Sequence, residues 1–169
     1  MLTGANPWRR SSTAWRARVA ATRHECGREV HVYGLGRRKT EGRLRFLPLS
    51  DLSFPADMAA CEAVVGAAGH QTIGEALYLG KPFFAWPETR HFEQRINAFM
   101  LQRMGCGRFE LLEQVRQEQL PSFIAELGLH REHIARQTHL RNAVPTTVEV
   151  ITRHLPIPAR TRICHAAVG

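Results

Sequence analysis

The chain has 169 residues, 44% of them hydrophobic, which is the size and apolar content of one globular domain with a buried core. No apolar run approaches the roughly 18 residues of a membrane-spanning helix, and no apolar stretch follows the arginines of the first twelve residues. We therefore expect neither a transmembrane segment nor a secretory signal. The four cysteines form no CxxC pair, which argues against a zinc site or a disulfide framework and predicts reduced thiols in the cytoplasm.

The net charge of +8 is concentrated at one end of the chain. Residues 1–45 hold eleven Lys and Arg against three acids, whereas residues 46–169 hold twelve of each. The basic segment shows no helix-turn-helix or zinc-finger pattern and no interleaved aromatic residues, so a nucleic-acid partner is not expected. Peripheral association with an anionic membrane surface, at the inner face, remains one interpretation. A solvated face in an arginine-rich chain remains the other.

Taken in chain order, residues 1–10 are expected to be disordered, residues 11–155 to form one domain, and residues 156–169 to be a disordered tail. Residues 15–26 show helical spacing of Trp15, Val19, Thr22 and Cys26. Two strands, a loop and a short helix follow, over Val30–Tyr33, Leu44–Leu47, Pro48–Pro55 and Asp57–Cys61.

The segment from Ala63 to Ala98 is the most informative part of the sequence. A short apolar strand ends at Gly66, and a helix is expected from Gln71 or Thr72 to Leu79, where glycine and proline supply the stop. A second strand, a polar loop and a longer helix follow, over Phe83–Trp86, Pro87–His91 and Phe92–Met104. The longer helix has one apolar face, formed by Phe92, Ile96, Phe99 and Met100.

Beyond this segment the pattern predicts one more strand, over Phe109–Leu112, and then only helices. The helices are expected over Glu113–Gln119, Pro121–Leu127 (ended by Gly128), Arg131–Arg141 and Thr146–Leu155. Strands that alternate with helices predict an α/β fold, with a Rossmann-like parallel sheet flanked by helices. Small residues ahead of free helix N–H groups at the first turn favour binding of a phosphate there.

The residue pattern of this segment resembles the C-terminal nucleotide-sugar domain of GT-B glycosyltransferases, most closely the family 28 type. The resemblance spans roughly Leu44 to Phe109, and an unrelated doubly wound domain with similar helix-stop chemistry is the alternative. It is carried by Gly69, Gln71, Thr72, Glu75, Gly80, Pro82, Pro87, Glu93, Gln94, Asn97 and Ala98. It implies a UDP-sugar as donor substrate, hexosyl transfer as the reaction, and no cofactor or metal ion, because helix dipoles stand in for the metal.

The first turn would hold the diphosphate and the ribose. Gly69 has no Cβ, so a diphosphate can approach the backbone closely. His70, Gln71 and Thr72 stand at the helix start, where N–H groups and the threonine hydroxyl can meet phosphate oxygens. The resemblance assigns Glu75 to the ribose hydroxyls.

The second loop would hold the transferred sugar. By resemblance, Glu93 and Gln94 bind its hydroxyls, and His91 matches a histidine of the preceding loop. Asn97 would bond either the turn or the ligand. Transferases of the plant type have a histidine two residues before the glycine, where this chain has Ala67. A histidine contact to the diphosphate would therefore require His70 to substitute for it.

No catalytic residue is assigned, since the general base in the resembled enzymes comes from an N-terminal acceptor-binding domain. The chain resembles the C-terminal half alone, truncated at its N-terminus, so a separate acceptor-binding domain or subunit is the expected partner. Two alternatives remain: a non-catalytic binding or scaffold remnant of such an enzyme, and a part of a sugar-nucleotide epimerase.

Overall fold

The computed structural model describes Trp15 and residues 17–19, 27–36, 38–48, 53–137 and 144–155. Of the helix expected over residues 15–26, Trp15 and residues 17–19 are helical, and the remainder lies outside the described residues. The two segments expected to be disordered, 1–10 and 156–169, also lie outside them.

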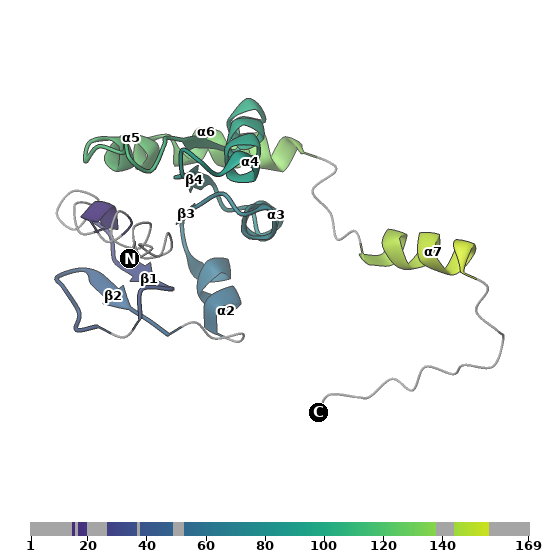
Figure 1. Cartoon of the computed structure of the whole chain (residues 1–169), viewed down its shortest axis with the longest axis horizontal. Coiled ribbons are helices and arrows are strands. Elements are labelled where there is room, and N and C mark those ends of the chain that lie inside the picture. Colours follow the sequence, from purple (N-terminus) through teal and green to yellow (C-terminus); the bar gives the residue numbers. More distant parts are fainter. Residues whose placement is uncertain are drawn as a thin grey trace, which may run out of the picture.

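Strands and helices alternate from residue 44 to residue 125 (Figure 1). In chain order the elements are β1 (Val30–Val32), β2 (Leu44–Phe46), α2 (Ser53–Ala60), β3 (Val64–Gly66), α3 (His70–Tyr78), β4 (Phe83–Ala85), α4 (Phe92–Arg103), β5 (Gly107–Phe109), α5 (Gln119–Ala125), α6 (Leu127–Arg136) and α7 (Val144–His154). Strands β1 and β2 pair in parallel, and β3, β4 and β5 form a second parallel sheet with β4 in the middle. The predicted α/β fold with parallel strands and flanking helices is therefore confirmed.

Strand β4 lies at the centre of the core because both of its faces are covered. Phe83 and Ala85 belong to one cluster of buried residues, with side chains of α3 and α4, while Phe84 belongs to a second cluster with Trp86 and the helix α5. Neighbouring strands come very close to β4: a Cβ on Gly107 would lie 1.9 Å from the Phe83 carbonyl oxygen. These contacts fix the sheet. The loops after β3 and β4 follow the carboxyl ends of its strands.

The structure corrects several expected boundaries. Helix α2 starts at Ser53, inside the expected loop, because Pro55 falls in its first turn, where no backbone N–H is needed. Strand β5 starts at Gly107, two positions before the expected Phe109. Helix α6 runs through Gly128, which the sequence suggested as a stop.

The helix expected over Glu113–Gln119 is wrong, because this stretch forms turns that lead to the start of α5. The backbone N–H of Leu112 donates to the carbonyl of Pro87 at 3.0 Å, so the chain continues beside the loop after β4 instead of coiling. The buried side chains of Leu112 and Val115 hold these turns against the core.

The apolar face expected on α4 exists, but it faces solvent. Phe92, Ile96, Phe99 and Met100 are 46–75% exposed, and α4 instead buries Ala98 and Leu101. Helix α7 buries no residue and lies apart from the sheets in Figure 1. Within the described residues, no helix has both the length and the apolarity needed to cross a bilayer.

Candidate functional site

Two helices begin just beyond the carboxyl ends of neighbouring strands. Helix α3 begins at His70, soon after β3 ends at Gly66, and α4 begins at Phe92, after the loop that follows β4. Because β3 and β4 are parallel and adjacent, both helix starts lie at the same edge of the sheet. This edge is where open α/β sheets bind their ligands.

The turn between β3 and α3 is held in an unusual conformation. Ala68 is fully buried and has a φ of 65°, which makes it the one residue other than glycine with a positive φ among those the structure describes. L-residues adopt this region at an energetic penalty, so the surroundings must hold it in place. The side-chain amide of Asn97, on α4, donates to the carbonyl oxygen of Ala68 at 3.1 Å. Asn97 thus joins the two loops.

The backbone at Gly69 is open. Its φ of −62° and ψ of 135° are ordinary for any residue, and a Cβ built there would meet nothing closer than the Thr72 hydroxyl oxygen, 4.0 Å away. Neither the conformation nor the packing of the described residues therefore requires glycine at this position. The remaining physical reason is space for a group that approaches the backbone from outside.

The start of α3 is uncapped. Gly69 occupies the N-cap and no side chain bonds to the free N–H groups, while the first intrahelical bond runs from the N–H of Ile73 to the carbonyl of Gly69, at 3.1 Å. His70 and Gln71 are exposed and Thr72 is half-buried. The first turn contains no acidic residue. Free N–H groups and the positive end of the helix dipole therefore face solvent together, which suits an anion.

Glu75 lies one turn into α3, on the same side as Gln71. The amide of Gln71 donates to Oε1 of Glu75 at 2.9 Å, and both side chains are exposed. This bond orients the carboxylate beside the helix start, and a carboxylate has enough lone pairs to accept further hydroxyl hydrogen bonds.

The loop after β4 is held by a side chain of α4. Oε1 of Gln94 accepts a hydrogen bond from the backbone N–H of Glu88 at 3.1 Å, so part of Gln94 braces the loop. His91 is the N-cap of α4 and is exposed. Glu93 is also exposed, and its Oε1 lies 3.5 Å from the amide nitrogen of Asn97.

The assigned residues thus fall into two groups. Asn97 and Gln94 bond the protein itself and set the shape of the two loops. The others present backbone or side-chain groups to solvent at the sheet edge: Gly69, His70, Gln71, Thr72, Glu75, His91 and Glu93. Ala68 was missed by sequence reasoning, because nothing in the local sequence indicates a positive φ at an alanine.

A separate polar contact lies between β1 and α2. The Tyr33 hydroxyl donates to the Asp57 carboxylate, and the Tyr33 ring packs edge-on against Phe54 at 5.0 Å between ring centroids. Desolvation, together with the hydrogen bond to Asp57, raises the pKa of Tyr33 to about 12. The hydrogen bond from Tyr33, with a further contribution from His31, lowers the pKa of Asp57. This contact joins α2 to the first sheet.

Comparison with known proteins identifies the family of this chain. Residues 10–128 match the family model of glycosyl transferase family 1. A curated relative, an uncharacterized glycosyltransferase of Methanosarcina acetivorans, is 35% identical over 65 residues, which cover 38% of this chain and 17% of the relative.

Solved structures show the same fold at low sequence identity. MurG of Acinetobacter baumannii superposes with a TM-score of 0.59 at 17% identity, over 85% of this chain and 46% of MurG. LpCGTa, solved in complex with UDP, superposes with a TM-score of 0.59 at 19% identity, over 90% of this chain and 40% of LpCGTa. The chain therefore spans less than half the length of these proteins.

The fold is therefore that of a C-terminal-like domain of GT-B glycosyltransferases. The match over residues 10–128 places the chain within a family: it belongs to glycosyl transferase family 1.

Proposed function

We propose that this chain is the UDP-sugar-binding half of a hexosyltransferase, and that it needs an acceptor-binding domain or subunit for turnover. The observation that carries the proposal is the open backbone at Gly69 beside the uncapped start of α3. No described neighbour occupies the space that a Cβ would take there, and the N–H groups next to it have no side-chain cap. A diphosphate fits both features.

The other groups at this edge fit the remaining parts of such a donor. Glu75 is oriented by Gln71 for the ribose hydroxyls, and Glu93 and His91 stand in solvent at the start of α4 for the transferred sugar. The complex of LpCGTa with UDP supports uracil as the base, since that protein shares the fold. The departing diphosphate would be stabilised by N–H groups and the α3 dipole, so we propose binding without a metal ion.

The acceptor-binding domain and the general base would come from the partner. We place the reaction in the cytoplasm, and the excess positive charge of residues 1–45 would favour the surface of an anionic membrane. The positive charge supports the proposed peripheral association with a membrane. The four cysteines, which form no CxxC pair, support the proposed cytoplasmic location.

Calorimetric titration of the purified chain with UDP tests the donor site directly. We expect saturable binding with one UDP per chain, and the same affinity in the presence of EDTA. UMP serves as the control, since it lacks the second phosphate and should bind more weakly. Absence of UDP binding by the folded chain would refute the donor site, and binding that disappears with EDTA would refute the helix-dipole account.

A further inference from the structure

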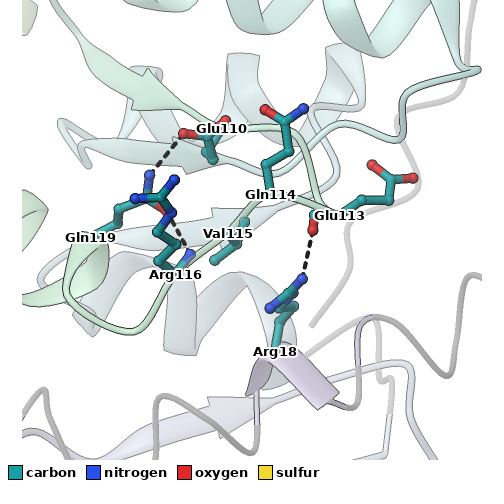
Figure 2. Close-up of a pocket in the computed structure, with 7 residues that line it drawn as sticks. All are labelled: Arg18, Glu110, Glu113, Gln114, Val115, Arg116 and Gln119. Carbon is teal, nitrogen blue, oxygen red and sulfur yellow. Dashed lines mark hydrogen bonds between the residues drawn. The ribbon is translucent and has the colours of Figure 1, made fainter.

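A hollow of about 520 Å³ lies beyond the edge strand β5, and none of the residues assigned to the donor site lines it. It is open to solvent, and all of its lining residues except Val115 are polar or charged. Figure 2 shows the lining side chains around it, with Arg18 on the N-terminal helical segment and the others on the stretch after β5. The lining residues are Arg18, Glu110, Glu113, Gln114, Val115, Arg116 and Gln119.

One wall of the hollow is fixed by internal hydrogen bonds. The amide of Gln119 donates to Oε2 of Glu110 at 2.7 Å, and its carbonyl oxygen accepts from the backbone N–H of Arg116 at 2.8 Å. On another side, the guanidinium of Arg18 donates to the backbone carbonyls of Leu112 and Glu113, at 3.2 and 2.6 Å. These polar groups are therefore held in place before any ligand arrives, which reduces the entropy lost on binding.

The hollow offers both hydrogen-bond donors and hydrogen-bond acceptors to a ligand. The carboxamide of Gln114 and the guanidinium of Arg116 have no partner within the described part of the chain, and both are exposed donors. The carboxylates of Glu110 and Glu113 supply acceptors. Two guanidinium groups balance two carboxylates, so the hollow has no net charge. A phosphate would meet the carboxylates, whereas a group with many hydroxyls can donate to the carboxylates and accept from Gln114 and Arg116.

The hollow is coupled to the loop that follows β4. The hydroxyl of Thr89, in that loop, donates to Oε2 of Glu113 at 2.7 Å. Partial burial raises the pKa of Glu113, but the hydrogen bond from Thr89 and the charge of Arg18 outweigh this effect and lower it, so the carboxylate stays ionised. The hollow thus lies beside the loop that we assign to the transferred sugar.

We propose that this hollow is a carbohydrate subsite, which binds an uncharged sugar unit of the acceptor next to the donor-sugar loop. The assignment of that sugar to the acceptor rests on the proposed transferase function. The binding of a neutral sugar rests on the hollow itself.

Titration of the whole chain with glucose, N-acetylglucosamine and maltose, followed by NMR, tests the subsite. The side-chain amide signals of Gln114 and Gln119 lie in the hollow, so at least one of these sugars should shift both signals saturably. The double variant Gln114→Ala/Arg116→Ala should bind that sugar about tenfold more weakly, since two direct hydrogen bonds are lost. Arg136→Ala is the matched control, because Arg136 is exposed on α6 and pairs with Glu132, outside the hollow.

The same proteins are titrated with UDP, so that the donor site and the carbohydrate subsite are tested separately. UDP affinity should be equal in the double variant and the parent chain. A failure of UDP binding alone would remove the donor site and the acceptor assignment while leaving the neutral-sugar site. The carbohydrate subsite is overturned if none of the sugars shifts Gln114 and Gln119 saturably, if the shifts appear at His70 to Glu75 instead, or if inorganic phosphate binds the hollow more tightly than the sugars.

Discussion

The side chain of Asn97 and the backbone of Ala68 are 29 positions apart in sequence and are joined by a 3.1 Å hydrogen bond. Ala68 carries the positive φ of the turn before α3, and Asn97 lies one turn into α4. This contact therefore ties the turn before the uncapped α3 start to helix α4. A donor that spans both loops would require this relative position.

Removal of the Asn97 amide should loosen the turn. We expect Asn97→Ala to reduce the free energy of unfolding by about 1 kcal/mol, the usual value of one hydrogen bond, and to weaken UDP binding as well. Chemical denaturation and calorimetric titration measure the two effects. Asn97→Asp loses the donor and places a carboxylate beside the Ala68 carbonyl oxygen and the Glu93 carboxylate, so both effects should be at least as large as in Asn97→Ala. Full UDP affinity in both variants would show that the contact has no role in the site.

Gly69→Ala should leave the fold intact and impair binding. The backbone dihedrals suit alanine, and the new Cβ would lie 4.0 Å from the nearest atom, so the thermal midpoint should hardly change. UDP affinity should fall by about tenfold or more, because the methyl group occupies the space we assign to the diphosphate.

Two other glycines provide the contrast for Gly69. Gly66→Ala would bring a Cβ to 2.9 Å from the Phe83 ring, and Gly107→Ala to 1.9 Å from a backbone oxygen, so both should lower the thermal midpoint markedly. Unchanged UDP affinity in a folded Gly69→Ala protein would contradict the assignment of this turn to the diphosphate.

Glu75→Gln tests the ribose contact. The substitution keeps the shape of the side chain, but a neutral amide oxygen accepts hydroxyl hydrogen bonds less strongly than a carboxylate, by an amount that corresponds to about tenfold or more in UDP affinity. The side chain is exposed, so the thermal midpoint should stay nearly constant. Glu132→Gln, at an exposed position of α6, is the control. Equal UDP affinities of the two variants would rule out the role of Glu75.

The hydrogen bond between Tyr33 and Asp57 predicts a pH dependence of stability. Since the folded chain lowers the pKa of Asp57 below 3.8, its contribution is present above that value and is lost as the pH falls through the lowered pKa. The difference in unfolding free energy between the parent chain and Tyr33→Phe should therefore shrink on acidification. A difference in unfolding free energy that stays constant as the pH falls would contradict the contribution of the Tyr33–Asp57 hydrogen bond.

The same pair can be observed at alkaline pH. In a Tyr78→Phe background Tyr33 is the one remaining tyrosine, and its phenolate absorbance should rise with a midpoint at about 12. Asp57→Asn should lower that midpoint in part, because desolvation, the largest cause of the raised pKa, remains.

Sugar transfer should require a second polypeptide. We expect the chain alone to give no turnover of a UDP-sugar, because donor and acceptor must be held together in the reactive geometry. Addition of a separately expressed acceptor-binding domain from a family relative should restore it. Product formation by this chain alone, followed by release of UDP, would refute the requirement and would call for a general base among the exposed side chains of His70, His91 and Glu93.

The sequence predicted those features that depend on neighbouring residues. The end of α3 is an example: Gly80 has a φ of 73° and Pro82 follows it, and both are local signals. Strand β4 was recognised because it is a continuous apolar run. Both helix starts of the candidate site were also predicted from local signals, to within two residues.

Features that depend on distant contacts could not be predicted. The conformation of Ala68 is held by Asn97 from another helix, and no periodicity records such a contact. The sequence predicts a helix over Glu113–Gln119, but the hydrogen bond between Leu112 and Pro87 directs the chain along the edge of the sheet. The apolar spacing on α4 was correct as a pattern, yet the pattern cannot tell whether core or solvent covers it.

The exposed apolar face of α4 has a practical consequence for handling the isolated chain. Phe92 is 75% and Phe99 54% exposed, and together with Ile96 and Met100 they form a stripe along the helix. Stripes of this kind govern retention on phenyl-type resins and the salt concentration at which a protein precipitates. Retention of the chain on such a resin should therefore rise with the concentration of ammonium sulfate, despite the strong positive charge of the chain.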